Sequence, residues 1–281
     1  MLSAYTDMGT KHMAQIKDRR QTRLDDLLAD IVSCEYRNHQ CEGLKDLIPR
    51  QELNLWNCWQ GDLYARLMVI GQDFGNAETQ PISVEDMRQH IPWRAETDSR
   101  PVNLKQWCPT DRALRALFSS VFGVDLTKPQ KLFFTNMACC YREGKTSGED
   151  KRLDRWLPCC ANRYMGKLLR IIRPQAIIAL GQRTLEALYY CEGAIITRQN
   201  NEDVGLRLKE GQTGFSNTMN FDYTMTFSDD RSLQIAVFPV YHPEYYAHIK
   251  NGEAIQRQVW ERIAGRLNHL DDRILRELHA E

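Results

Sequence analysis

The sequence predicts an α/β fold, a three-layer sandwich with a central, largely parallel four-stranded sheet. Four short apolar runs, rich in β-branched or aromatic residues, occur at wide spacing and are typical of buried strands. Stretches with helical periodicity separate them, and this alternation indicates parallel strands that are buried on both faces. The length of 281 residues with 42% hydrophobic residues fits one large domain better than two.

The first expected element is a helix near the N-terminus. Residues 1–23 are polar, partly basic and without a clear period, so we expect an N-terminal arm there. Leu24, Leu27, Leu28 and Ile31 follow at helical spacing. The single folded domain is therefore expected to span residues 24–281.

The strands and the remaining helices follow in alternation. The expected strands are 65–71 (ARLMVIG), 131–138 (KLFFTNMA), 175–181 (QAIIALG) and 235–243 (IAVFPVYHP). Helices are expected at Leu114–Val121 after the cap-like Thr110-Asp111, over about 151–172, and from Thr184. A last helix should pack outside the sheet, with its apolar face formed by Ile255, Val259, Ile263, Leu267, Leu270, Ile274 and Leu278.

Two polar segments, 76–108 and 191–234, lie between core elements and are interpreted as insertions in the domain. The second contains Phe221, Tyr223, Met225 and Phe227 at alternate positions, which is typical of a hairpin. Inserted loops on a rigid scaffold commonly carry recognition.

Composition excludes several classes of protein. The 37 Lys+Arg residues balance 37 Asp+Glu residues, so any binding to a polyanion must come from a local patch. No apolar run approaches the ~20 residues of a membrane span, and the N-terminus lacks an apolar signal region, so we expect a cytoplasmic protein without membrane association. Disulfides are then not expected among the nine cysteines, and Cys58, Cys108 and Cys191 are interpreted as small buried hydrophobic residues.

Polar residues follow three of the strands, at the sheet edge where open α/β folds bind ligands. Asp73 stands on a glycine-bounded loop after the first strand, although it could equally cap a helix. Asn136 ends the second strand and could read a base edge or simply form a turn. His242 follows the fourth strand, where a solvated turn histidine is the alternative. Together, an acid, an amide and an imidazole are what cleavage of an N-glycosidic bond requires.

Four segments, GQDFGNAE, FFTNMACCYREG, IIRPQAIIALG and VYHPEYYAHIKN, together resemble the uracil-DNA glycosylase superfamily, from about residue 34 to residue 255. The GQD start resembles the ordinary uracil-DNA glycosylases. The Gly75-x-x-Glu78 continuation and the HPEYY run are more similar to the iron–sulfur branch. The resemblance implies a monofunctional DNA glycosylase of the uracil-DNA glycosylase-like fold, with DNA as its partner, and we expect a monomer.

The resemblance also implies roles for individual residues. Asp73 would position water and offset the sugar's positive charge, His242 would bind O2 of the departing base, and Asn136 would read the base edge. Gln72, Phe74, Gly75 and Glu78 would line the base site, with Phe74 or Trp107 stacking on the base. No lysine is placed at the reacting centre, so no Schiff-base lyase step is expected.

The same resemblance assigns four cysteines to a metal cofactor. Cys34, Cys41, Cys140 and Cys160 would bind a [4Fe–4S] cluster, since four thiolates are a complete ligand set. The first pair is spaced more widely than in that branch, and Cys139 or Cys159 could replace its neighbour. Zinc is the alternative, because a tetrahedral set of four cysteines suits it as well.

DNA contact is expected from local charge and from aromatic residues. Residues 142–173 contain nine basic and four acidic residues and begin close to Asn136, so Arg142 and Lys145 are candidate phosphate ligands, with a solvated helix face as the alternative. Tyr245 and Tyr246 could fill the gap left by a flipped base or could be packing residues.

The identity of the base depends on one replacement. In ordinary uracil-DNA glycosylases a tyrosine after GQD-Pro closes the pocket against C5 substituents, whereas this chain has Phe74-Gly75. Either Glu78 restores the barrier and uracil is the substrate, or the pocket admits a 5-substituted pyrimidine. The corresponding roles are base-excision repair and defence against phage with modified DNA. The rival hypothesis is a non-catalytic iron–sulfur module that binds nucleic acid, which would not need both Asp73 and His242.

Overall fold

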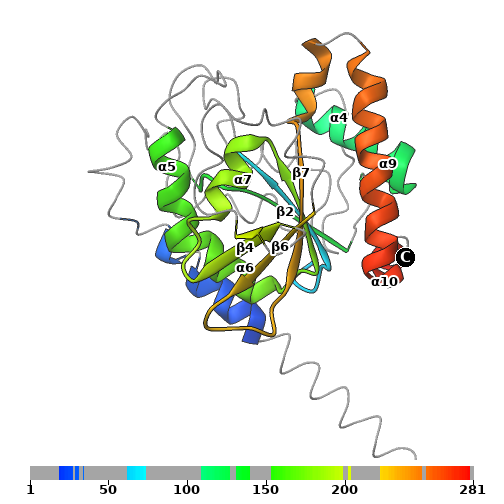
Figure 1. Cartoon of the computed structure of the whole chain (residues 1–281). Helices are drawn as coiled ribbons and strands as arrows, with labels where there is room; N and C mark the ends of the chain where they lie inside the picture. The colour runs from blue at the N-terminus through cyan, green and yellow to red at the C-terminus, as the bar shows by residue number, and fades with distance from the viewer. Residues whose placement is uncertain are drawn as a thin grey trace, which may run out of the picture.

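Strands and helices alternate along the chain, as the sequence predicts (Figure 1). The computed structural model describes residues 19–27, 29–31, 34, 62–73, 109–126, 131–139, 153–198, 202–203, 222–248 and 251–278. In chain order its elements are β1 (Leu67–Gly71), α4 (Pro109–Leu117), the π-helical turn η3 (Phe118–Phe122), β2 (Leu132–Asn136), α5 (Leu153–Cys160), the π-helical turn η4 (Ala161–Met165), α6 (Gly166–Ile172), β3 (Ala176–Leu180), α7 (Gln182–Leu188), β4 (Ala194–Arg198), β5 (Glu202–Asp203), β6 (Tyr223–Phe227), β7 (Ile235–Val240), the 3₁₀ helix η5 (Pro243–His248), α9 (Gly252–Leu270) and α10 (Asp272–Leu278).

The sheet has the order β2-β1-β3-β7-β6-β4-β5, and its first four strands are the four that the sequence predicts. These four are parallel, which confirms the predicted parallel core. The prediction of four strands in all is wrong, because the described residues form seven. The additional strands come from the segment interpreted as an insertion at 191–234. Because β6 pairs antiparallel with β7 and β4 pairs antiparallel with β6, the expected hairpin extends the sheet.

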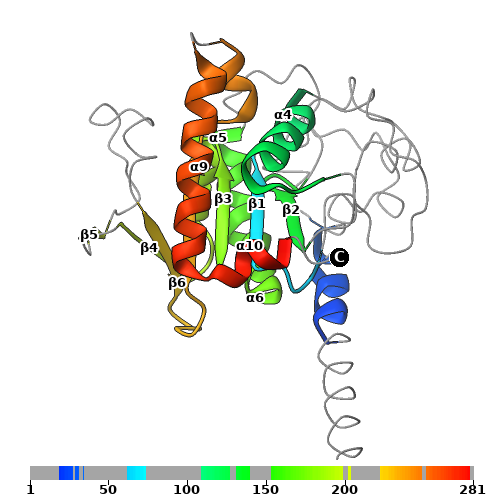
Figure 2. The same cartoon turned by 90° about the vertical axis from the view of Figure 1, so that its right-hand side faces the viewer.

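Each core strand contributes side chains to two apolar layers. Met68 and Ile70 of β1 belong to one buried cluster, and Leu67 and Val69 belong to the other. The first layer is covered by the N-terminal helix and by α5, α6 and α7, and the second by α4, α9 and α10 (Figures 1 and 2). This confirms the three-layer arrangement, in which a strand buried on both faces needs an apolar residue at every position.

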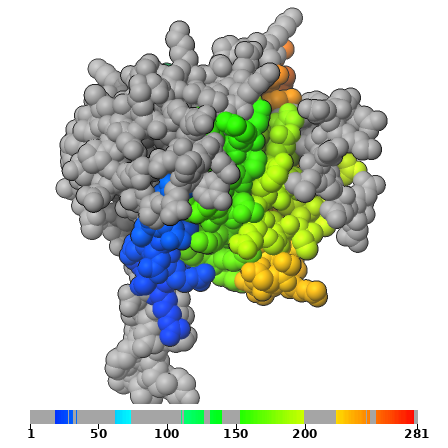
Figure 3. All heavy atoms as spheres, turned by 90° about the vertical axis from the view of Figure 1, so that its left-hand side faces the viewer, coloured from blue at the N-terminus to red at the C-terminus, as the bar shows by residue number. Residues whose placement is uncertain are grey.

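The described part of the N-terminal helix includes residues 19–23, which lie within the segment expected to be an arm. Leu24, Leu27 and Ile31 are buried, as their spacing predicts. Arg20 donates from Nη1 to the Leu63 carbonyl at 2.8 Å and to the Ile172 carbonyl at 3.2 Å. Its guanidinium also lies 4.4 Å from the ring centroid of Tyr64. These contacts attach the helix to the end of α6 and to the segment before β1 (Figure 3).

The C-terminal helix is broken, and its buried face agrees with the prediction at Ile263, Leu267, Ile274 and Leu278 but differs from it elsewhere. On α9 the buried residues are Gln256, Trp260, Ile263 and Leu267 together with Gly252. The predicted face included Ile255 and Leu270, which are 41% and 49% exposed. The face of α9 that carries Trp260 is directed toward the sheet. The Trp260 ring packs there against Phe118 and Phe122, with centroids 5.6 Å and 5.9 Å apart.

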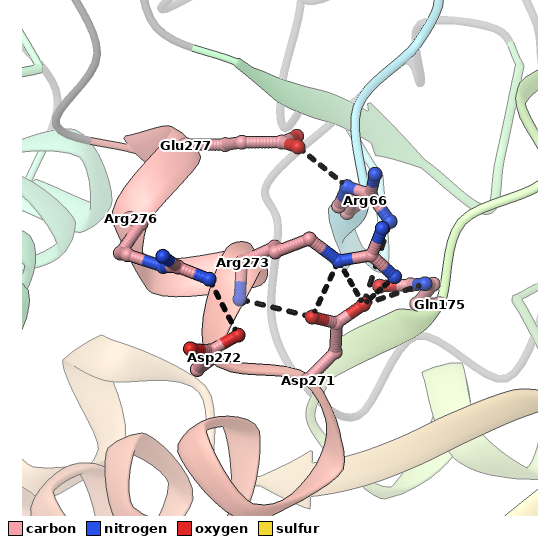
Figure 4. A network of polar contacts seen from close by, with 7 residues as sticks. All are labelled: Arg66, Gln175, Asp271, Asp272, Arg273, Arg276 and Glu277. Atoms are coloured by element: carbon pink, nitrogen blue, oxygen red, sulfur yellow. Dashed lines mark hydrogen bonds and ion pairs between the residues drawn. The ribbon is translucent and has the colours of Figure 1, made fainter.

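The break between α9 and α10 is held by Asp271, at the edge of the sheet where β1 and β3 begin (Figure 4). Gln175, just before β3, donates from Nε2 to Asp271 Oδ2 at 3.1 Å. Arg66, just before β1, lies 3.5 Å from Asp271 and 2.8 Å from Glu277. Hydrogen bonds from Arg273 hold the pKa of Asp271 well below its usual range. The network fixes the C-terminal helices to the amino ends of two core strands.

In the described part of the chain, each helix is too short or too polar to cross a bilayer.

Candidate active site

The carboxyl ends of β1 and β2 bring Asn136 beside the segment that carries Asp73. Gly71 is in register with Asn136. Pairing continues past the strands, since the Met137 N–H donates to the Gly71 carbonyl at 2.8 Å and the Ala138 N–H donates to the Gln72 carbonyl at 2.9 Å. The predicted base-reading amide and the predicted catalytic acid are thus held on adjoining, hydrogen-bonded segments.

Gly71 allows the amide of Asn136 to lie directly over the end of β1. A Cβ at Gly71 would stand 2.1 Å from Asn136 Oδ1 and 3.3 Å from Asn136 Cγ, which is closer than real side chains approach. The Asn136 side chain is 5% exposed. The absence of a side chain at Gly71 therefore leaves the space that this amide occupies, and sequence analysis missed that role of Gly71.

Gln72 orients the carboxylate of Asp73. Its Nε2 donates to Asp73 Oδ2 at 2.8 Å, and both side chains are partly exposed. A hydrogen bond to one carboxylate oxygen restricts the rotation of the group. The other predicted residues of the base site, Phe74, Gly75 and Glu78, lie outside the described residues, as does Trp107.

His242 stands at the same sheet edge, between the end of β7 and the start of η5. The Gly181 N–H donates to the Val240 carbonyl at 2.6 Å, and the Tyr245 N–H donates to the His242 carbonyl at 2.9 Å. Gln256 of α9, 7% exposed, donates from Nε2 to the Pro243 carbonyl at 3.4 Å. Hydrogen bonds on both sides of His242 thus fix the backbone around it.

Strand β3 lies between the strands that precede Asp73 and His242. Neighbouring strands are ~4.8 Å apart, so the two loops leave the sheet roughly 10 Å from each other. Between them β3 ends at Gly181, whose φ of 92° is a conformation that favours glycine. Among the described residues, no heavy atom lies within 4 Å of a Cβ placed at Gly181. The described residues therefore leave space at the end of β3, between the two loops.

The two candidate tyrosines after His242 differ in exposure. Tyr245 is 44% exposed, whereas Tyr246 is 3% exposed. Burial, followed by the influence of Tyr241, raises the pKa of Tyr246 to about 12. Tyr246 is a packing residue, which was one of the two alternatives, and Tyr245 is the tyrosine of this pair that DNA could reach.

Only part of the basic segment 142–173 can lie near the predicted site. Its helices α5 and α6 lead back to the start of β3, so its last residues lie at the amino edge of the sheet. There Lys167 pairs with Asp30 at 3.0 Å and Arg170 with Asp229 at 2.7 Å. Arg173 pairs with Asp230 and lowers the pKa of that carboxyl to about 2. The candidate phosphate ligands Arg142 and Lys145 lie outside the described residues.

Two of the four predicted metal ligands lie within the described residues. Cys34 and Cys160 are 8% and 7% exposed and belong to the same apolar cluster. Tyr164, beyond Cys160 in η4, donates its hydroxyl to the Asp30 carbonyl at 3.5 Å, and burial, followed by the influence of Cys34, raises the pKa of Tyr164. The N-terminal segment therefore contacts η4 at Tyr164, four residues after Cys160. The other two ligands, Cys41 and Cys140, fall outside the described residues.

Cys139 and Cys159 were the possible replacements for Cys140 and Cys160 as metal ligands. Cys139 is 2% exposed and Cys159 is partly exposed, so burial favours Cys160 over its neighbour in that pair. Pro158 and the π-helical turn η4 stand on either side of Cys159 and Cys160, and such turns often occur at functional sites. Cys191 is buried, as predicted, and burial raises its pKa to about 12.

Gln256 is a second residue whose role sequence analysis missed. It occupies the buried face of α9 with Trp260, Ile263 and Leu267. A glutamine within an otherwise apolar helical stripe is the signal that could have identified it, because a buried polar group needs a hydrogen-bond partner.

The comparisons with known proteins agree with this architecture. The family model of the Uracil DNA glycosylase superfamily matches residues 58–264. A search of curated proteins gives no significant match. The matched span covers most of the chain and includes β1 to β7 with Asp73, Asn136 and His242, whereas Cys34 and Cys41 precede it. The chain therefore belongs to the uracil DNA glycosylase superfamily.

Proposed function

We propose that this protein is a monofunctional DNA glycosylase, which flips a pyrimidine nucleotide out of DNA and hydrolyses its N-glycosidic bond. Members of the superfamily are DNA glycosylases, and the observation that supports this activity here is the delivery of Asp73, Asn136 and His242 to one sheet edge. We further assign the protein to the iron–sulfur branch, with a GQD-type first motif.

Each residue has one task in this mechanism. DNA is bound with the target nucleotide unstacked, at a cost of a few kcal/mol. The amide of Asn136, held over Gly71, hydrogen-bonds the base edge. Asp73, oriented by Gln72, directs a water molecule to C1′ and offsets the positive charge of the oxocarbenium-like sugar.

His242 acts on the leaving group. As the bond between C1′ and the base nitrogen breaks, negative charge develops on O2 of the base, and a ring N–H of His242 donates a hydrogen bond to it. Water supplies the hydroxyl that remains on C1′. The proton that this water releases neutralises the departing base anion. The products are a free base and an abasic site, with the DNA strand intact.

Base release tests the proposed activity directly. Wild-type protein should liberate a free pyrimidine base, detected by mass spectrometry, from at least one substrate among uracil oligonucleotides and genomic DNAs of cells and phages. Binding of these DNAs without release of any base would contradict the proposal and favour the non-catalytic binding module.

The substrate is uracil or a 5-substituted pyrimidine, and Gly75 supports the wider pocket. Replacing Gly75 with tyrosine should reduce kcat/KM for 5-hydroxymethylated or glucosylated pyrimidines much more than for uracil, because uracil has only hydrogen at C5. Steric exclusion can exceed the ~1–3 kcal/mol that a missing methylene provides. The measurement is kcat/KM on matched oligonucleotides. If wild type releases uracil alone and Gly75→Tyr leaves this activity unchanged, the pocket is closed by another residue.

The proposed cofactor is a [4Fe–4S] cluster bound by Cys34, Cys41, Cys140 and Cys160. The burial of Cys34 and Cys160 in one apolar cluster supports it, since an enclosed site protects a cluster from solvent. When bound, the cluster would tie the N-terminal segment to α5. It takes no part in the hydrolysis derived above.

Anaerobically purified protein should be brown, with a broad absorbance near ~400 nm from charge transfer between thiolate and iron. Cys160→Ala should abolish this absorbance and lower the unfolding temperature. Cys191→Ala is the matched control, because Cys191 is equally buried and is not a proposed ligand. A colourless protein with one equivalent of zinc would exclude the cluster and support the zinc alternative.

A further inference from the structure

Three tyrosines form a preformed aromatic cluster beside His242. The rings of Tyr241 and Tyr245 are stacked, with centroids 4.3 Å apart and an interplanar angle of 16°. Tyr246 meets both rings edge-on, at 5.6 Å and 87° from Tyr241 and at 6.1 Å and 77° from Tyr245. The buried Tyr246 thus holds the stacked pair in place.

The outer face of this stack is open. Tyr241 covers one face of the Tyr245 ring and Tyr246 meets it edge-on, yet Tyr245 is 44% exposed. The exposed surface of Tyr245 therefore lies away from the face that Tyr241 covers. The backbone hydrogen bond of 2.9 Å from Tyr245 to His242 keeps the ring close to the reacting centre.

We propose that the Tyr241–Tyr245 pair is a stacking subsite for an unpaired base next to the flipped nucleotide, and that the protein consequently prefers single-stranded or locally unpaired DNA. A base has an aromatic face of its own, and a ring already fixed in a stack loses little conformational freedom when it binds one. In a duplex such a base is held by pairing and by its other neighbour, whereas an unpaired base is free to move onto the ring. The proposal rests on the proposed glycosylase function and adds the ligand of this surface.

A platform and a wedge would use the Tyr245 ring in different ways. A wedge acts by filling the volume of the flipped base, so any apolar side chain of similar size suffices. A platform acts through the planar face of a ring, which leucine cannot replace. Tyr245→Leu therefore separates the two mechanisms, and Tyr245→Phe should preserve both.

The test combines this substitution with removal of the neighbouring base. Dissociation constants and base-release rates are measured on single-stranded and double-stranded oligonucleotides carrying the released base, with the nucleotide on either side of it intact or replaced by an abasic spacer. On the intact single strand, Tyr245→Leu should weaken binding about 5- to 100-fold, the range for loss of one stacked base. Tyr245→Phe should stay within about twofold of wild type, because it retains the ring.

The spacer on the stacking side should weaken wild-type binding by the same factor and should remove the effect of Tyr245→Leu, since the two changes delete one interaction. Tyr190→Leu is the matched control, because Tyr190 is 43% exposed and lies beyond α7, outside the proposed site. It should leave every value unchanged.

Two outcomes would overturn the stacking subsite. One is wild-type affinity of Tyr245→Leu for the intact single strand, and the other is an equal effect of this substitution with and without the spacer. A wedge would instead show tighter binding of duplex DNA and tolerance of leucine. Failure of the proposed function has a different signature, in which wild type releases no base from any of the substrates.

Discussion

Replacing Asp73 with asparagine should slow base release by a factor of ~10²–10⁴ while leaving the affinity for DNA nearly unchanged. The substitution preserves shape and removes the negative charge that offsets the sugar cation and directs water. Gln72 can still donate to the remaining carbonyl oxygen, so local geometry should survive. Single-turnover rates measured with enzyme in excess would isolate the chemical step.

The matched control is Asp62→Asn, at the opposite end of β1. Asp62 Oδ1 accepts the Tyr64 N–H at 2.7 Å, a bond that asparagine can also accept. This variant should release bases at the wild-type rate. A wild-type rate in Asp73→Asn as well would mean that the Asp73 carboxylate does not take part in catalysis. Its role as a helix cap would then be favoured.

Replacing Gly71 with alanine should destabilise the protein by ~1–3 kcal/mol, the usual cost of overpacking, and should impair base release through the displaced Asn136 amide. The added Cβ would stand 2.1 Å from Asn136 Oδ1. In an Asn136→Ala background this atom is gone, so the same substitution should cost much less. Chemical denaturation of the four proteins of this cycle measures the coupling.

Gly265→Ala provides a control of opposite sign. Gly265 lies within α9, and none of the described atoms comes within 4 Å of a Cβ placed there. Alanine should therefore stabilise the helix by ~0.5–1 kcal/mol. Equal penalties for Gly71→Ala with and without the Asn136 amide would show that the close contact does not hold the amide in place.

The sequence and the structure agree on the elements of the core and differ on their surroundings. Apolar runs predict β1 and β3 over their whole length and β2 over Leu132–Phe134, because a strand buried on both faces favours apolar residues at successive positions. The buried face of the last helix was harder to predict, since Ile255 and Val259 fit the helical period as well as Gln256 and Trp260 do. In the structure the large ring of Trp260 packs against Phe118, and the face with Gln256 and Trp260 is the buried one.

The candidate site shows the same division. The placement of Asp73, Asn136 and His242 at one sheet edge could be predicted, because each lies at or just after the end of a recognisable strand and the carboxyl ends of parallel strands share one edge. The Arg170 and Arg173 contacts could not, since charge counted along the chain does not tell which end of a crossover helix faces the ligand. Their partners, Asp229 and Asp230, are far away in the sequence.

The sequence by itself therefore determined the positions of the four parallel strands and the residues that follow them, because both depend on local periodicity and on the direction of the chain. Only the tertiary structure decided that β3 separates Asp73 from His242, that β6 extends the sheet, and that Gly71 lies beneath the Asn136 amide. It also decided that Tyr241 and Tyr245 stack with one face exposed. These features depend on which surfaces meet across the fold, and that choice is made by packing among distant segments, which no local pattern records.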